Sequence, residues 1–245
     1  MAPEKTEIRK PGGKIIRGVV YSASGADKSS PLVILSHGFC SSYRAFTHHG
    51  EGFAAAGISC LTFDFCGGAP DSESDGDFAD MSVLTEKSDL LDVISFAKRE
   101  ISFGGLFLMG ESQGGLVSLL AGNEAPGVSG LVLWYPAFVI PDDAKRRTSG
   151  QRSRVLMGVT IGGAYDKDAL KVDILSEQRR FTKPVLLVHG DRDGLVPISY
   201  SQDAQKRFPD AELITIEGAG HGFDYPDNER ARNESIQFIR RVSGK

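Results

Sequence analysis

The sequence has 245 residues and a formal net charge of −4, and hydrophobic and charged residues make up 40% and 24% of it. These are ordinary values for a soluble globular protein, and the slightly acidic balance argues against a nucleic-acid partner. The longest apolar run, Leu131 to Ile140, is too short to span a bilayer, so we expect no membrane association.

The cysteines and the N-terminal residues give an indication of the cellular compartment in which the protein folds. The three cysteines, Cys40, Cys60 and Cys66, form no C-x-x-C pair, and their odd number argues against a disulfide framework. The first ten residues are charged and lack the apolar core of a signal peptide. We therefore expect a cytoplasmic protein, and whether it forms a homodimer is left open.

Short apolar runs alternate along the chain with stretches of helical spacing. The runs predict strands at 15–21, 32–35, 58–63, 106–109, 128–134, 185–189 and 212–216. The helical spacing predicts helices at 46–56, 82–100, 116–121, 199–208 and 229–241. Continuous apolar runs suit strands that are buried on both faces, and the alternation implies right-handed crossovers. We predict one α/β domain, residues 1–245, with a mostly parallel twisted sheet and helices on both faces.

One segment, Ala137 to Ile174, contains no clear strand and interrupts this alternation. It leaves the predicted sheet at the carboxyl end of a strand, the edge where ligands bind in open α/β sheets. An insertion of this length inside a compact domain is usually functional, so we predict a short lid. Its basic residues are interpreted as a solvated face, and the attraction of anionic esters is the alternative. These residues are Lys145, Arg146, Arg147, Arg152 and Arg154.

The strongest local pattern is G-x-S-x-G at residues 110–114. It follows the apolar run 106–109 and precedes a predicted helix, the context of a nucleophile elbow. The turn is tight, so the neighbours of the serine must be small, and Gly110 and Gly114 leave room for the backbone. The serine oxygen then lies at a helix N-terminus, which favours a developing anion. We therefore predict Ser112 as a nucleophile.

A serine nucleophile needs a base, and the base in turn needs an acid. In this arrangement the chain order is Ser, then Asp or Glu, then His, and His221 lies in a glycine-rich loop after the last predicted strand. His189 is interpreted as shaping a turn. Asp191 and Asp193 are both candidates for the acid. Asp193 is favoured because it occupies the usual acid position of H-G-x-x-D-x-x-V-P segments.

The oxyanion that forms during acyl transfer needs two N–H donors. The backbone N–H of Gln113, directly after the nucleophile, is the first predicted donor, and that of Phe39, after an early strand, is the second. His37 is interpreted as a buried brace for the second loop. No residues stand at metal-ligand spacing, so we predict no metal and no cofactor.

With these residues in place, the chain resembles the α/β-hydrolase superfamily, and more narrowly the bacterial cinnamoyl (feruloyl) esterases and related small carboxylesterases. The resemblance spans nearly the full length, and it implies the triad Ser112, Asp193 and His221 and an oxyanion hole at Phe39 and Gln113. It also matches the lid insertion after Pro136-Ala137. The sequence departs from the family at Glu111, where histidine is usual, and at Cys66-Gly67-Gly68, where G-H-G is common. The motifs that carry it are Ser36 to Phe39, Asp64 with Ser74 to Gly76, Gly110 to Gly115, Tyr135 to Ala137, Thr182 to Pro184 with Val188 to Asp191, and Gly218 to His221.

The predicted function is that of a serine carboxylesterase acting on small short-chain or hydroxycinnamoyl esters through an acyl-enzyme at Ser112. Trp134 and Tyr135 are predicted to narrow the substrate pocket beneath the lid. The partner is a small-molecule ester. Other activities of the same fold remain open, namely acyl transfer, C–C hydrolysis and peptide hydrolysis, as does a non-catalytic binding protein.

Overall fold

The computed structural model describes residues 2–244 and is built on a mostly parallel sheet of eight strands. The strand order is β1-β2-β4-β3-β5-β6-β9-β10, and within this sheet of the described residues β2 alone runs antiparallel to its neighbours, β1 and β4. The strands are Glu4–Arg9 (β1), Ile15–Tyr21 (β2), Pro31–Ser36 (β3), Ser59–Phe63 (β4), Gly105–Glu111 (β5), Val128–Trp134 (β6), Val185–Gly190 (β9) and Ala211–Ile216 (β10). The predicted α/β fold is therefore confirmed.

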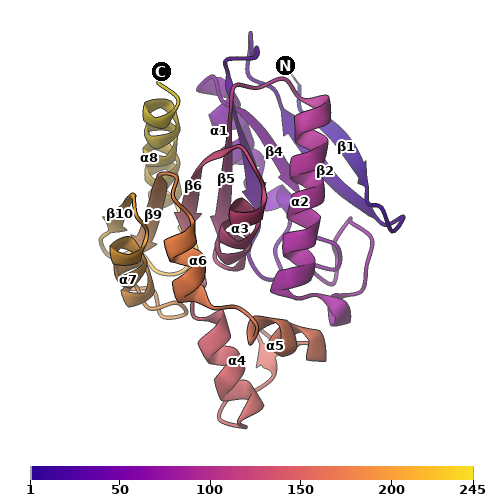
Figure 1. Ribbon diagram of the computed structural model, residues 1–245, viewed down its shortest axis with the longest axis vertical. Coiled ribbons are helices and arrows are strands. Elements are labelled where there is room, and N and C mark those ends of the chain that lie inside the picture. Colours follow the sequence, from indigo (N-terminus) through magenta and orange to yellow (C-terminus); the bar gives the residue numbers. More distant parts are fainter. Residues whose placement is uncertain (1, 245) are drawn as a thin grey trace.

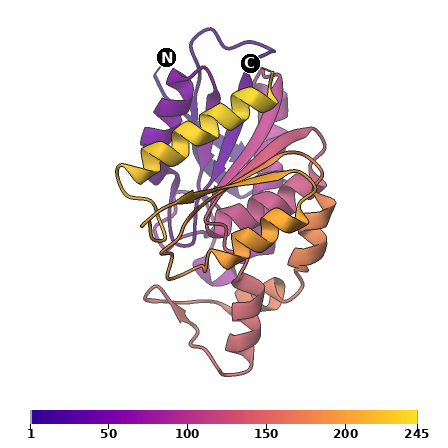
Figure 2. The ribbon, with the colours of Figure 1, turned by 90° about the vertical axis from the view of Figure 1, so that its left-hand side faces the viewer.

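Helices cover both faces of this sheet, as Figures 1 and 2 show. Two of them, α1 (Thr47–Ala55) and α8 (Asp227–Val242), pack on one face. The opposite face is covered by α2 (Val83–Glu100), α3 (Gln113–Glu124), α6 (Ile174–Arg180) and α7 (Ser199–Arg207). Strands β3, β4 and β9 are buried along their whole length, which explains their continuous apolar runs. The sheet thus separates two hydrophobic cores.

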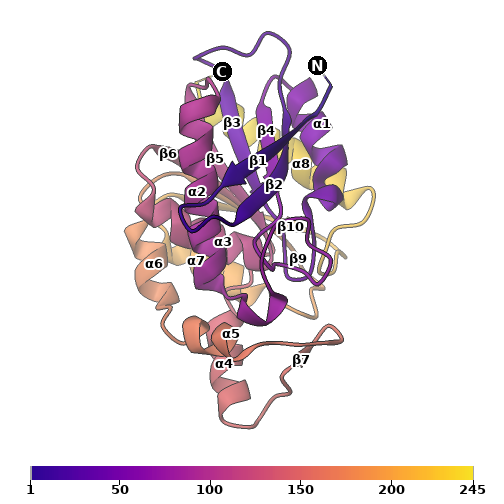
Figure 3. The same cartoon turned by 90° about the vertical axis from the view of Figure 1, so that its right-hand side faces the viewer.

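The insertion that the sequence predicted follows β6 and lies at the end of the molecule opposite both chain termini (Figure 1). It contains α4 (Ile140–Thr148), a small hairpin of two-residue strands at Val155–Leu156 (β7) and Val159–Thr160 (β8), and α5 (Gly163–Ala169). Figure 3 shows the hairpin projecting from this end. Pro141 lies in the first turn of α4, and the acidic first turn and basic last turn of that helix complement its dipole.

The helices and the hairpin of the insertion were not predicted from the sequence, and outside it sequence reasoning missed one strand and one α-helix. Strand β1 (EKTEIR) buries one side chain, that of Ile8, because it lies at the edge of the sheet and faces solvent. Helix α6 is short and mostly exposed, and its start is fixed by Asp173, whose carboxylate accepts N–H bonds from Leu175 and Ser176. Neither element carries an apolar periodicity. No helix within residues 2–244 combines the length and the apolar character needed to cross a membrane.

Candidate active site

Ser112 lies in the tight turn that joins β5 to α3. Its φ of 50° and ψ of −117° form a backbone conformation that residues other than glycine rarely adopt. A Cβ atom on Gly110 would lie 2.2 Å from the carbonyl oxygen of Gly114, and one on Gly114 would lie 2.2 Å from that of Ser36. Both glycines are therefore sterically required, as the sequence predicted, and they hold the serine in a strained elbow.

The side chains of Ser112, His221 and Asp193 form a continuous chain of hydrogen bonds. The Ser112 Oγ atom lies 3.0 Å from His221 Nε2, and His221 Nδ1 lies 2.7 Å from Asp193 Oδ2. Because the carboxylate can only accept, His221 Nδ1 carries a proton and Nε2 is the atom that accepts from the serine hydroxyl. The structure thus brings together the three residues that the sequence had singled out.

The carboxylate of Asp193 accepts further hydrogen bonds besides the one from His221. Its side chain is fully buried, and its Oδ1 atom accepts N–H bonds from Leu195 at 2.9 Å and Val196 at 2.8 Å. Burial alone would raise the pKa of Asp193, but hydrogen bonds from His189, His221 and Val196 outweigh it and hold the pKa below its usual range. The carboxylate is therefore ionised and fixed in place.

His189 plays a part that the sequence did not reveal. Its ring is fully buried, and its Nε2 atom lies 3.1 Å from Asp193 Oδ2 and 3.0 Å from the Val196 carbonyl oxygen. Its Nδ1 atom lies 2.7 Å from the Ser201 hydroxyl at the start of α7. The ring shapes the turn, as predicted, and also supports the carboxylate that contacts His221.

Asp191, the other candidate for the acid, is exposed and points elsewhere. Its Oδ1 atom accepts the N–H of Gly218 at 2.7 Å, at the start of the loop that carries His221. Asp191 therefore ties two loops together, and the structure places Asp193, not Asp191, against the imidazole.

Gln113 directly follows the serine, and the residue before Phe39, Gly38, approaches it closely. Gln113 is the first residue of α3, and a Cβ atom on Gly38 would lie 3.4 Å from Ser112 Cβ, so the loop at Phe39 runs beside the nucleophile. His37 braces this loop as predicted: its Nε2 accepts the Phe65 N–H at 3.2 Å, and its Nδ1 donates to the Gly38 carbonyl at 2.8 Å. Phe39 and Gln113 therefore follow residues that lie at the nucleophile, and their role as oxyanion donors stays a prediction.

Tyr135 lies against the imidazole of His221, and Glu111, the residue before the nucleophile, is a neighbour of Tyr135. The Tyr135 ring is 4.7 Å from the His221 ring, and the Tyr135 backbone has a φ of 35°. Burial of the carboxyl raises the pKa of Glu111 to about 7, and the hydrogen bond with Tyr135 partly opposes this rise. The elbow therefore contains an acid that changes charge near neutral pH.

Replacing Glu111 by glutamine is expected to stabilise the protein at pH 8 much more than at pH 5. The folded-state pKa lies above the ordinary value of 4.5, so the wild-type protein loses stability as the pH rises through this window. The loss grows by about 1.4 kcal/mol for each pH unit within it. Urea unfolding at both pH values measures the difference. Glu217→Gln, at an exposed site, is the matched control, and a Glu111→Gln effect that does not change with pH would contradict the assignment.

The prediction that Trp134 narrows the substrate pocket is wrong. The indole is 1% exposed, its N–H donates to the Ser235 hydroxyl of α8 at 3.0 Å, and its ring packs edge-on against His49. It points to the α1 and α8 side of the sheet because β6 alternates its side chains between faces. Tyr135, the next residue, does lie at the site, with its ring against His221 and Phe223.

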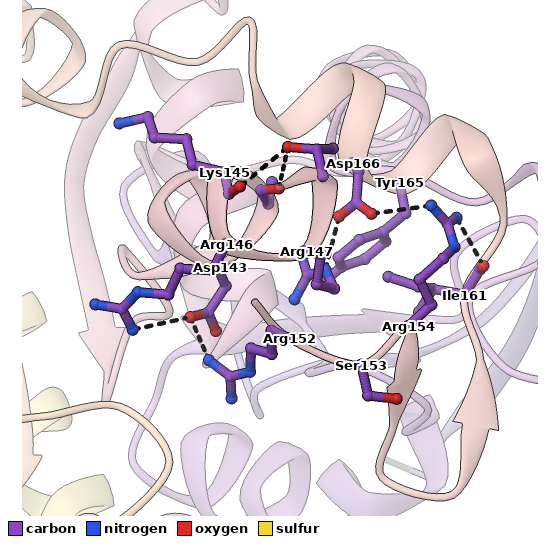
Figure 4. A network of polar contacts seen from close by, with 12 residues as sticks. Asp143, Lys145, Arg146, Arg147, Arg152, Ser153, Arg154, Ile161, Tyr165 and Asp166 are labelled. Atoms are coloured by element: carbon purple, nitrogen blue, oxygen red, sulfur yellow. Dashed lines mark hydrogen bonds and ion pairs between the residues drawn. The ribbon is translucent and has the colours of Figure 1, made fainter. Parts of the chain in front are cut away.

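Four of the five basic residues of the insertion are exposed, as the interpretation of a solvated face predicts, but the side chain of Arg147 is buried. Figure 4 shows the four arginines paired with Asp143 or Asp166 of the same segment. Arg147 Nε lies 2.7 Å from Asp166 Oδ1, and both side chains are 2% exposed. The other pairs are Arg154–Asp166 at 3.3 Å, Arg146–Asp143 at 3.6 Å, Lys145–Asp142 at 3.0 Å and Arg152–Asp143. The burial of Arg147 could not be predicted locally, because its partner Asp166 lies 19 residues further along the chain.

Comparisons with known proteins agree with this geometry. A family model described as "Serine aminopeptidase, S33" matches residues 27–173, more than half of the chain. The chain belongs to this family of α/β hydrolases. A second model, described as "TAP-like protein", matches residues 167–243 of the hydrolase.

Solved structures resemble the hydrolase over nearly its whole length. Est1E from Butyrivibrio proteoclasticus, solved with ferulic acid bound, is 26% identical, with a TM-score of 0.87 over 98% of this chain and 100% of that one. GrgF from Penicillium sp. sh18 is 20% identical, with a TM-score of 0.82 over the whole of both chains, and shows the fold alone. Among curated proteins, the non-heme chloroperoxidase CPO-A1 of Kitasatospora aureofaciens is 34% identical over 88 residues, 34% of this chain. That match spans only 32% of the relative's length.

Proposed function

We propose that the hydrolase is a serine carboxylesterase that cleaves small esters, with short-chain acyl or hydroxycinnamoyl groups, through an acyl-enzyme at Ser112. The observation that carries this proposal is the hydrogen-bond chain from the strained Ser112 through His221 to the buried Asp193, at 3.0 and 2.7 Å. A serine hydroxyl becomes an effective nucleophile when such a base removes its proton.

In the first half of the proposed reaction, Ser112 Oγ attacks the ester carbonyl carbon and its proton passes to His221 Nε2. Asp193 stabilises the imidazolium that forms, and it stays ionised because its hydrogen bonds favour the charged form. The N–H groups of Phe39 and Gln113 hold the negative oxygen of the tetrahedral intermediate. The intermediate then collapses, the C–O bond to the alcohol breaks, and His221 protonates the leaving oxygen.

In the second half, a water molecule attacks the acyl-enzyme carbonyl and gives a proton to His221 Nε2. The second tetrahedral intermediate uses the same two N–H donors, and its collapse returns the proton to Ser112 Oγ and releases the carboxylic acid. The reaction consumes one ester and one water and yields one alcohol and one acid, so no cofactor takes part in the proposal.

The proposed substrate class rests on likeness and on the insertion. The ferulic acid bound to Est1E supports a hydroxycinnamoyl group, and the small insertion supports small acyl groups. We also propose that the insertion acts as the lid over this site. The three free thiols, Cys40, Cys60 and Cys66, support a reducing compartment, and we propose the cytoplasm.

The test combines a serine-reactive probe with a substrate panel. We expect a fluorophosphonate probe to label the purified protein, and p-nitrophenyl acetate, p-nitrophenyl butyrate and methyl ferulate to be hydrolysed. Alanine p-nitroanilide is the comparison substrate for peptide hydrolysis. A protein that the probe does not label and that cleaves none of the esters would refute the proposal. Cleavage of the anilide with a higher kcat/KM than every ester would make it a peptidase.

A further inference from the structure

We infer that Tyr165, on helix α5 of the insertion, is a positioning residue that holds both sides of the oxyanion hole. This inference rests on the proposed function, because it assigns a task within the same site. It is carried by the contacts of one side chain with the two residues whose N–H groups are the proposed donors.

The first contact runs to Gln113. The Tyr165 hydroxyl donates to Gln113 Oε1 at 2.6 Å, and Gln113 Nε2 donates to Glu86 Oε2 on α2 at 2.7 Å. Gln113 and Glu86 are at most 1% exposed, and Tyr165 is 2% exposed. Both the oxygen and the nitrogen of the Gln113 amide are thus hydrogen-bonded in a buried environment, where a hydrogen bond restrains geometry most strongly. Fixing this side chain fixes the first residue of α3, and with it the direction of the Gln113 N–H.

The second contact runs to Phe39. The rings of Phe39 and Tyr165 meet edge to face, with centroids 5.8 Å apart. Such a pair favours one orientation of the Phe39 ring, and the ring in turn restrains the backbone of the loop that carries the second N–H. A single tyrosine therefore touches both predicted donor residues from the side of the insertion.

Ion pairs and a hydrogen bond hold α5, and with it Tyr165, against the neighbouring elements. The neighbouring Asp166 binds Arg147 of α4 in a buried ion pair and also binds Arg154, as Figure 4 shows. Asp168 accepts the hydroxyl proton of Ser82, the N-cap of α2, at 2.6 Å. A Cβ atom on Gly162 would lie 1.8 Å from the Ala79 carbonyl oxygen, so the chain before α5 packs directly on its neighbour.

These contacts give the insertion a task beyond covering the substrate. The hydroxyl of Tyr165 forms its hydrogen bond within the protein, so its effect on the reaction passes through Gln113. A donor must lie within about 0.5 Å of its productive position beside the oxyanion, and it loses most of its benefit when it is displaced further. Loss of the hydroxyl should therefore weaken transition-state binding and leave ground-state binding nearly unchanged.

The test is Tyr165→Phe, which keeps the ring on Phe39 and removes only the hydrogen bond to Gln113. The matched control is Tyr200→Phe, because the Tyr200 hydroxyl bonds Asp142 of α4 at 3.0 Å and also ties the insertion to the core. We expect Tyr165→Phe to lower kcat for p-nitrophenyl butyrate about 10- to 100-fold with KM within about 3-fold. Tyr200→Phe should stay close to wild type in both constants.

Inhibitors and a second substitution separate positioning from a merely structural role. 1-Propylboronic acid, which forms a tetrahedral adduct with serine, should bind Tyr165→Phe more weakly by about the factor lost in kcat, whereas butyrate should bind equally well. In a Gln113→Leu background, Tyr165→Phe should have no further effect on kcat, because the partner is already gone. Melting temperatures of Tyr165→Phe and Tyr200→Phe report any common loss of stability.

Two different failures are distinguishable. A wild-type protein that is inactive on all esters and unlabelled by the fluorophosphonate would overturn the proposed function, and this inference with it. An active wild type in which Tyr165→Phe is no slower than Tyr200→Phe, or loses boronate and butyrate affinity equally, would overturn this inference alone.

Discussion

Replacing Ser112 by alanine is expected to lower kcat for p-nitrophenyl butyrate by at least about 10⁴-fold. The hydroxyl is the proposed nucleophile, and neither His221 nor the oxyanion donors can form the acyl-enzyme without it. Steady-state assays with burst-phase detection of p-nitrophenol would measure both the rate and the lost covalent step. The fluorophosphonate label should disappear from the variant.

The fold should survive this substitution, because the Ser112 hydroxyl bonds one side chain, that of His221. We expect the free energy of unfolding to change by less than about 1 kcal/mol. Ser118→Ala is the matched control: Ser118 lies on α3, the helix that follows Ser112, is fully buried, and its hydroxyl has no hydrogen-bond partner within residues 2–244. We expect wild-type activity in the control. Retention of the fluorophosphonate label in Ser112→Ala would show that another residue is the nucleophile.

The sheet and the elbow could be predicted because their determinants are local. Strand β6 has the predicted bounds. A strand that is buried on both faces is apolar along its length, so its ends coincide with the ends of the apolar run in the sequence. The glycines around Ser112 have a steric cause that acts over a few residues of the turn, so the motif alone indicates the geometry. His221 and Asp193 could be proposed from chain order, although the choice between Asp191 and Asp193 required the fold.

Contacts between distant segments could not be predicted in this way. Tyr165 and Gln113 are 52 residues apart, and nothing in the local pattern of either indicates that they bond. Arg147 reads as a surface charge within its own segment and becomes buried only when α5 brings Asp166 against it. The burial of Trp134 was missed for a related reason: the face to which a strand residue points depends on register, which the neighbouring strands fix.

Replacing Asp193 by asparagine is expected to lower kcat by about 10³- to 10⁴-fold, whereas Asp191→Asn should change it by less than about 5-fold. Asp193 Oδ2 accepts from His221 Nδ1 at 2.7 Å, and an amide that donates at this position would hold the imidazole in the wrong tautomer, with Nε2 protonated and unable to accept from Ser112. In Asp191→Asn the amide oxygen would still accept the Gly218 N–H, so the tie between the two loops would persist. The two variants carry the same chemical change two residues apart, and each is the control for the other. Measurement of kcat and melting temperature for both decides the assignment: a large loss of kcat in Asp191→Asn with an active Asp193→Asn would move the acid to Asp191.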